Sequence, residues 1–149
     1  MASRTSMEQL VEMAKKKVDQ AAKALAARHA RERDAEAKLE LLVTYRTDYS
    51  SRYGDAAAAG MENHLLHNFR AFMHKLEAAI AEQQAVLAEA RAKARSARAQ
   101  WQAEQQRLKS YLVLADRRRG SERALQAKRD QREQDEHAAK AHARHRASA

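Results

Sequence analysis

The 149-residue sequence has no cysteine and no proline, and it contains only three glycines and seven aromatic residues. The lack of cysteine excludes a disulfide framework and thiolate metal sites, and it is compatible with a reducing compartment. The longest strongly apolar run, YLVLA at 111–115, is far too short to span a bilayer. The opening residues lack the apolar segment of a secretory signal. We therefore expect a soluble, cytoplasmic chain.

The residues that are present favour α-helix. There are 35 alanines, and most of the remainder are Glu, Gln, Lys, Arg and Leu, which lose little entropy in a helix. The formal net charge is +9, and more than half of it lies in residues 117–149, where ten Lys and Arg residues outnumber five Asp and Glu residues. Elsewhere, acids precede bases by four residues, as in Asp34 and Lys38, which is typical of a solvated helix face.

Apolar residues recur at alternating steps of four and three over two long stretches. Eleven of the fourteen positions counted in this way from Met7 to Tyr53 are apolar, and so are nine of the eleven from Ile80 to Ala115. A heptad pattern sustained over this length predicts a coiled coil. Phe72, Leu76 and Ile80 are four residues apart, and this spacing indicates a stutter that unwinds the supercoil locally.

The predicted fold class is all-α: a long two-helix antiparallel coiled-coil hairpin with a C-terminal helical overhang. We expect a single domain, with one helix over about 5–53, a turn over about 54–61 and a second helix over about 62–115, followed by a basic helical tail at 116–149. A turn at this place sets Leu42 near Phe72 and Leu39 near Leu76. Gly120 weakens the helix that contains it, so we expect fraying, or order induced by a partner, beyond it.

Aromatic residues gather near the predicted turn, and two interpretations of them are open. Tyr45, Tyr49 and Tyr53 are four residues apart and share a helix face, so they could simply lock the end of the hairpin. A two-helix hairpin buries only one stripe per helix, however, and several apolar residues here lie off the heptad core positions. Some of them should stay exposed and mark an interface; they are Leu41, Tyr45, Leu66, Met73 and Ala79.

No catalytic constellation is visible in the sequence. There is neither a Gly-rich phosphate loop nor a nucleophile motif. His64 and His67 are three residues apart on the second helix, and His74 follows seven residues later. A pair of histidines on a helix can bind a metal, but the sequence shows no further ligand at a suitable spacing and no second-shell partner. We expect solvated histidines, no metal, no cofactor, no small-molecule substrate and no enzymatic activity.

Five segments occur in order along the chain: LVEMAKKKVDQAAKAL, LELLVTYRTDYSSRY, NFRAFMHKLEAAIAEQQ, WQAEQQRLKSYLVLADRR and RDQREQDEHAAK. This succession resembles the FliJ family, small coiled-coil components of the bacterial flagellar type III export apparatus. The resemblance implies an antiparallel helical hairpin similar to the shaft of the rotary ATP synthase γ subunit. It also implies that the hairpin sits in the central pore of the hexameric export ATPase, contacts the export gate membrane protein and escorts free export chaperones. Such a protein lies in the cytoplasm, peripheral to the inner membrane.

The resemblance also implies which residues bind partners. Carried over position by position, the family's patch falls on Leu42, Tyr45, Tyr49, Phe72, Leu76 and Ala79. Of these, we expect Tyr45, Leu76 and Ala79 to lie on the accessible side. In the basic tail, the candidate contacts are Arg117, Arg118 and Arg119.

Three alternative functions follow from the same features. A basic coiled coil could bind nucleic acid nonspecifically, but residues 117–149 contain no aromatic residue on which bases could stack. The tail could bind anionic lipids, although it lacks Trp, Phe and a clean apolar face for insertion. The equivalent stalk of a virulence type III secretion system would have the same physical properties as a flagellar one.

Overall fold

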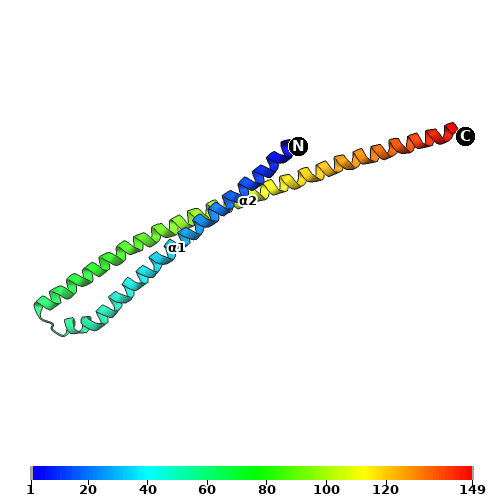
Figure 1. The fold of residues 1–149 in the computed structure, drawn as a ribbon. Coiled ribbons are helices and arrows are strands. Elements are labelled where there is room, and N and C mark those ends of the chain that lie inside the picture. Colours follow the sequence, from blue (N-terminus) through cyan, green and yellow to red (C-terminus); the bar gives the residue numbers. More distant parts are fainter. Residues whose placement is uncertain (1, 149) are drawn as a thin grey trace. The chain divides into compact units, whose positions relative to one another are not determined.

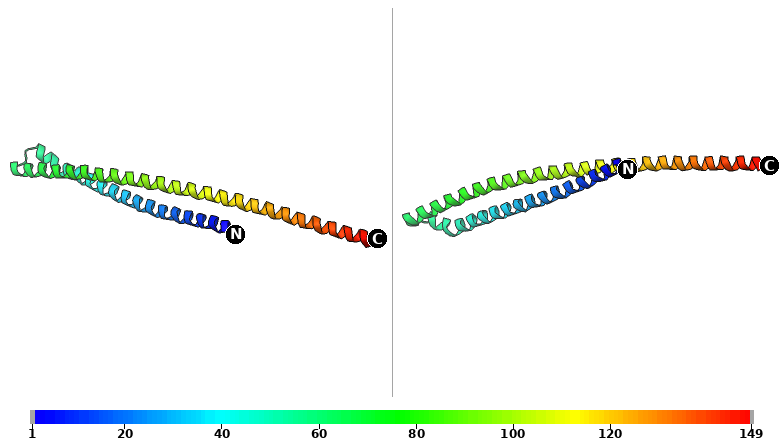
Figure 2. Two further views of the ribbon diagram at one scale, coloured as in Figure 1. Left: turned by 90° about the horizontal axis from the view of Figure 1, so that it is seen from above. Right: turned by 45° about the horizontal axis from the view of Figure 1, so that its top comes forward.

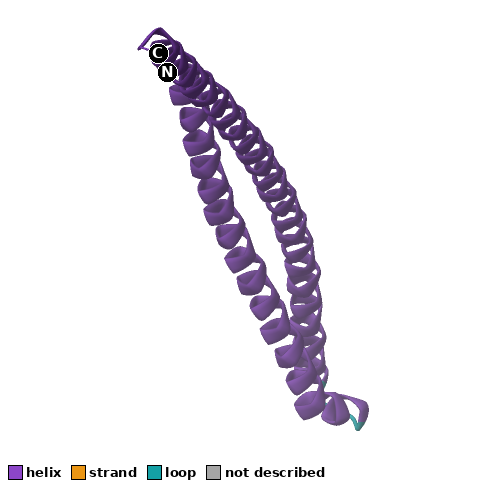
Figure 3. Ribbon diagram, turned by 90° about the vertical axis from the view of Figure 1, so that its right-hand side faces the viewer, coloured by secondary structure: helices purple, strands orange, loops and turns teal. Residues whose placement is uncertain are grey.

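The computed structural model describes residues 2–148, with side chains from residue 6 onward, and it contains two long helices. Helix α1 spans Ala2–Ala58 and helix α2 spans Asn63–Ser148, with a short loop between them that is teal in Figure 3. Residues 2–148 include no strand. The two helices pack against each other, which confirms the predicted all-α, two-helix hairpin.

The chain divides into two compact units. The first, Lys17–Glu104, contains the loop and the parts of both helices that flank it, and the second combines Met1–Lys16 with Gln105–Ala149. Within the first unit, α1 and α2 run side by side away from the loop, as the views in Figure 1 and Figure 2 agree. Because each helix has only one neighbour, the core is a single interface between the two helices.

Burial follows the predicted heptad pattern. Thirteen of the fourteen positions from Met7 to Tyr53 are buried or half-buried, and so are all eleven from Ile80 to Ala115. Polar residues at these positions, such as Arg28 and Glu104, are covered as well, so the spacing and not the polarity of a residue decides its burial. Leu76 and Ile80, whose four-residue spacing indicated a stutter in the heptad repeat, are both buried in the interface.

Residue size changes along the first unit. Alanines occupy buried positions far from the loop, at Ala21, Ala35 and Ala94, whereas Leu76 and Ile80 are buried nearer to it. An alanine covers little apolar area, but its small volume allows two helix backbones to approach closely. The alanine-rich part therefore depends on close helix packing, and the larger side chains near the loop contribute most of the buried apolar area.

The loop lies further along the chain than the sequence pattern predicted. Gly54 does not end α1: the helix continues through it to Ala58, and the Ala59 N–H donates to the Asp55 carbonyl at 3.0 Å. Gly60 ends the helix, since its φ of 108° lies in the region that side chains disfavour. A glycine inside a helix costs only about 1 kcal/mol relative to alanine, and four alanines follow Asp55, so the helix persists past Gly54.

This displacement of the loop changes the register of the two helices. The predicted partner of Phe72 was Leu42, but its ring neighbours are Tyr45 and Tyr49, three and seven residues closer to the loop. The Gln83 side chain also donates to the Ala35 carbonyl, at 3.1 Å. The predicted register was therefore wrong, because it assumed that Gly54 began the turn.

Charged side chains also cross between the helices in this register. Arg91 lies 3.7 Å from a carboxylate oxygen of Glu32 and 3.7 Å from one of Glu36. Polar pairs that form in only one alignment help to specify the register of a coiled coil, even where they add little stability. Arg91 and Gln83 thus favour the observed alignment over one that is shifted along the helices.

The basic tail is helical in the structure. Helix α2 continues through Gly120 to Ser148, and every residue from 121 to 148 is exposed. Hydrogen bonds within the helix, such as Gln126 to Asp130 and Gln131 to Asp135, both 3.1 Å, link side chains four residues apart. The helical overhang is thus present, and it has no covered face.

Matched substitutions at two glycines test this account of the loop and the tail. Gly120→Ala should stabilise the helix by up to about 1 kcal/mol, because an added Cβ meets nothing within 4 Å and alanine is the better helix former. Gly60→Ala should destabilise the hairpin by about 1–2 kcal/mol, because of its positive φ, although its surroundings are equally open. Thermal unfolding followed by circular dichroism should show melting temperatures that move in opposite directions. A lower melting temperature for both variants would contradict the assignment of Gly120 to an ordinary helical position.

Candidate docking surface at the hairpin turn

Five aromatic residues form a cluster where the two helices approach the loop. Tyr49 is central: its ring centroid lies 4.5 Å from that of Phe72 and 5.5 Å from that of Phe69. Tyr53 lies 4.8 Å from Tyr49 on the same helix. Tyr45 is 6.4 Å from Tyr49 and meets Phe72 edge-on at 6.0 Å. Such pairs typically contribute about 0.5–1.5 kcal/mol each beyond the area they bury, so the cluster holds the helices together near the loop.

The cluster also leaves apolar surface exposed on one side of the hairpin. Tyr45 is 50% exposed, and Leu41, one turn earlier on α1, is 71% exposed. Phe72, which touches Tyr45, and Ala79, seven residues later on α2, are half-buried on the same side. We call Leu41, Tyr45, Phe72 and Ala79 the docking face. It has more exposed apolar surface than closing the hairpin requires.

The remaining predicted site residues lie inside the interface between the helices. Leu42 and Tyr49 are half-buried at core positions, and Leu76 is only 7% exposed. The expectation that Leu76 lies on the accessible side was therefore wrong. Leu76 stands at a core position between Phe72 and Ile80, and the heptad pattern turns it toward α1. It can support the docking face from beneath but offers little surface to a partner.

A groove between the helices continues the docking face away from the loop. Lys38 lies seven residues before Tyr45 and Val86 seven residues after Ala79, so both belong to the same side of the hairpin. The groove has a volume of about 290 Å³, and we call it the shaft groove; it is lined by Arg28, Arg31, Asp34, Ala35, Lys38, Gln83, Val86, Glu89, Ala90 and Lys93. Arg28 stands at one of the three heptad positions from Met7 to Tyr53 that are not apolar, and no signal in the sequence joined it to the docking face.

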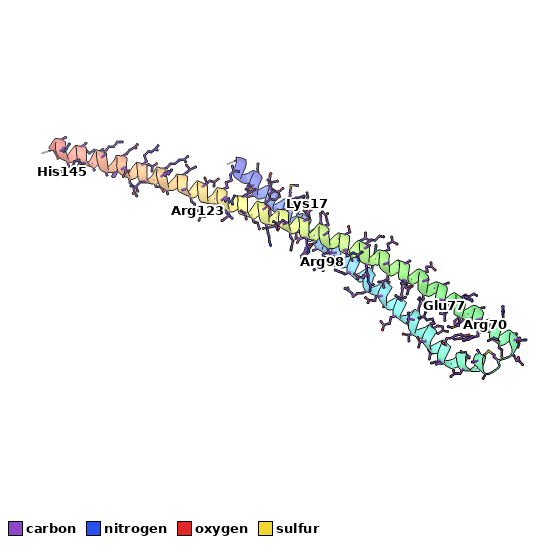
Figure 4. All side chains as sticks on the ribbon, turned by 180° about the vertical axis from the view of Figure 1, so that it is seen from behind. Lys17, Arg70, Glu77, Arg98, Arg123 and His145 are labelled. Atoms are coloured by element: carbon purple, nitrogen blue, oxygen red, sulfur yellow. The ribbon has the colours of Figure 1, made fainter. Side chains whose placement is uncertain are left out.

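The opposite side of the hairpin carries a different surface. A shallower groove there is lined by Gly54, Phe69 and Met73, together with polar residues that include Arg70 and Glu77. Figure 4 labels Arg70 and Glu77 on α2 near the loop. An added Cβ at Gly54 would lie 3.6 Å from the Ser50 hydroxyl oxygen, an ordinary contact distance, so an alanine would fit there.

The predicted tail contacts lie in the second unit. Arg118 is half-buried and lines a groove with Met7 and Val11, and it is 3.9 Å from Glu122. Arg119 is also 3.9 Å from an acid of its own helix, Asp116. Exposed pairs at this distance contribute little energy, so both arginines can turn to another anion at small cost. His145, labelled in Figure 4, lies on a part of α2 with no segment of α1 beside it.

The described residues contain neither a cluster of metal-binding side chains nor a membrane-spanning helix. No group of three or more His, Cys, Asp and Glu residues among them could hold a metal ion. Neither helix, over the residues described, is apolar for long enough to cross a membrane. Among the surface features of the described residues are the docking face, the grooves, the exposed basic tail and further exposed apolar residues such as Met13 and Val113.

The chain matches one family of known proteins over nearly its whole length. The model of the family described as "Flagellar FliJ protein" matches residues 3–147. A protein of Salmonella typhi with the same description is 29% identical over 141 residues, which cover 95% of this chain and 96% of the relative. A second relative with this description, from Escherichia coli (strain K12), is 27% identical over 141 residues, with the same shares of both chains covered.

Leucine substitutions should separate the supporting core from the exposed face. Leu76→Ala should reduce the free energy of unfolding by roughly 2–4 kcal/mol, because it removes a buried side chain. Leu41→Ala makes the same chemical change at a position that is 71% exposed, and it should change stability by less than about 0.5 kcal/mol. Urea unfolding followed by circular dichroism measures both values. If the two variants lose the same stability, Leu41 is not a surface residue and the docking face is wrongly drawn.

Proposed function

Because the chain belongs to the FliJ family of flagellar proteins, we propose that it is the stalk and adaptor of flagellar type III protein export. In this role it binds the hexameric export ATPase and the export gate and escorts free export chaperones, at the cytoplasmic face of the inner membrane. The observation that carries the proposal is the docking face, an exposed apolar surface on a hairpin whose other outward positions are mostly polar. Family membership alone supports the chaperone role.

The docking face suits the export gate as its partner. Tyr45 offers a large, rigid side chain that is half exposed yet held in place by Phe72 and Tyr49, and anchors of this kind dominate the energy of many interfaces. The flanking charges on α1 are already compensated, because Lys38 lies 3.3 Å from Asp34 and Arg52 lies 3.5 Å from Asp48. A partner can therefore cover the apolar centre without stranding an unpaired charge.

The basic tail suits the ATPase. Residues 121–148 are exposed, and the segment from residue 117 onward carries an excess of five positive charges. An exposed positive helix attracts an acidic surface over roughly the Debye length, about 8 Å at physiological ionic strength. The tail thus favours a partner whose binding surface is acidic, and the strength of that binding should depend on salt.

The first test of this function is Tyr45→Ala. It should weaken binding to the export gate by about 2 kcal/mol, or roughly thirtyfold in Kd, and it should reduce swimming although the protein accumulates normally. Its cost in stability should stay near 1 kcal/mol, since the substitution removes only partly exposed ring contacts. Val113→Ala is a control at a position that is 51% exposed and outside the docking face. Unchanged gate affinity and swimming in the Tyr45→Ala strain would refute the role of the docking face.

Truncation after Gly120 tests the tail. The truncated chain should bind the ATPase more weakly than the full chain, and its remaining affinity should fall less steeply with added salt. A full-length control, with Arg129 and Arg132 changed to Gln, keeps a similar helix propensity and brings the net charge beyond Gly120 from +2 to zero. Binding measured at low and high salt should show the same loss in both variants. If only the truncation weakens binding, the contribution of the tail is not electrostatic.

A further inference from the structure

The shaft groove contains two arginines without an internal partner. Arg28 and Arg31 line it from α1, and neither forms an ion pair with any of the side chains described, those of residues 6–148. Arg28 is half-buried at a heptad core position, and Arg31 is exposed one turn along the same wall. A partly buried guanidinium is screened less by salt than a fully exposed one, and it presents several N–H donors that suit a carboxylate.

The other charges that line the groove are already compensated. Asp34 lies 3.3 Å from Lys38, and Glu89 lies 3.2 Å from Lys93. The two arginines therefore give the groove its net positive charge.

The nearest further acid, Glu32, points elsewhere. One of its carboxylate oxygens is 3.4 Å from the His29 ring, and the other is 3.7 Å from Arg91. Neither Glu32 nor these two partners line the groove, and Arg91 is also 3.7 Å from Glu36. Glu32 does not neutralise Arg28 or Arg31, and the two arginines remain available to an external anion.

The floor of the groove is apolar and continuous with the docking face. Ala35 and Ala90 lie at its base, and Val86 is 46% exposed on its α2 wall. Val86 follows Ala79 and Phe72 at steps of seven residues, so one side of α2 carries the apolar surface from the docking face into the groove. A bound segment can therefore place one apolar side against both the docking face and the shaft groove.

The spacing of these features defines the ligand. Arg31 lies ten residues before Leu41 on α1, which corresponds to about 15 Å along the helix. We infer that the docking face and the shaft groove together bind one acidic amphipathic segment, with apolar side chains on Leu41 and Tyr45 and carboxylates on Arg28 and Arg31. A helix covers that separation in about ten residues and an extended strand in about five. This inference rests on the proposed function, in which the docking face binds the export gate.

Charge reversal tests the inference with the full-length chain and the cytoplasmic part of the export gate as the probe. Wild-type affinity should fall as salt rises. Arg28→Glu with Arg31→Glu should bind about tenfold or more weakly at low salt, with a flatter salt dependence. Lys23→Glu with Arg33→Glu makes the same change in net charge at exposed positions of α1 outside the groove, and it should bind as the wild type does. Arg31→Glu alone serves as a second variant, because Arg31 is exposed and its replacement should not disturb folding. It should show part of the loss of affinity that the double variant shows.

Comparison with Tyr45→Ala separates this inference from the proposed function. If Tyr45→Ala weakens binding while the Arg28 and Arg31 variants bind like the wild type, the gate binds the docking face but no acidic segment enters the groove, and the inference is wrong. If the control pair loses as much affinity as the groove pair, net charge alone is responsible, and the inference is again overturned. If neither Tyr45→Ala nor the groove variants affect binding, the proposed function fails together with the inference.

Discussion

The single interface between two helices is the constraint on which the rest of this structure depends. Each helix has one neighbour and can bury one stripe, so the heptad spacing assigns almost every side chain to the core or to solvent. Even Arg28, Glu32 and Gln83 are covered where the spacing places them. The described residues, 2–148, form no second layer in which surplus apolar residues could be hidden. An apolar residue off the stripe is therefore exposed, and Leu41, at 71%, is the clearest case.

The aromatic cluster connects the stability of the hairpin with its surface. Tyr49 packs between Phe69 and Phe72 and belongs to the interface, whereas Tyr45 covers the edge of Phe72 and is half exposed. The ring of Tyr45 is thus held rigidly by residues that also close the hairpin. A rigid exposed ring loses little entropy when a partner covers it, which is an advantage for an anchor residue. The two sequence-based interpretations of the aromatic residues are compatible, because Tyr49 lies between the helices while Tyr45 keeps half of its surface exposed.

Charge is arranged differently in different parts of the chain. Near the docking face most charges are paired within a helix, as in Asp34 with Lys38 and Asp48 with Arg52. The tail instead carries a positive excess, and its residues 121–148 are all exposed. Apolar binding at the docking face is largely independent of salt, whereas attraction to the tail is not. Arg28 and Arg31 are an exception beside the docking face, because two unpaired guanidinium groups there add a preference for carboxylates.

The sequence by itself determined the helices, the core positions and the region of the docking face. Alanine and straight-chain residues favour helix, and a repeat of four and three needs no knowledge of the partner helix to be recognised.

Tertiary structure alone decided where the turn falls, which residues face each other, and which members of the predicted site are accessible. Gly54 and Gly60 look alike in the sequence, but only Gly60 adopts a positive φ, and this choice shifts the register of every pair across the interface. Leu76 and Leu41 are likewise the same residue type, yet one is buried and the other is exposed. Arg28 and Arg31 join one groove with Val86 only when two segments distant in sequence are brought side by side, because the register of the pairing sets their neighbours.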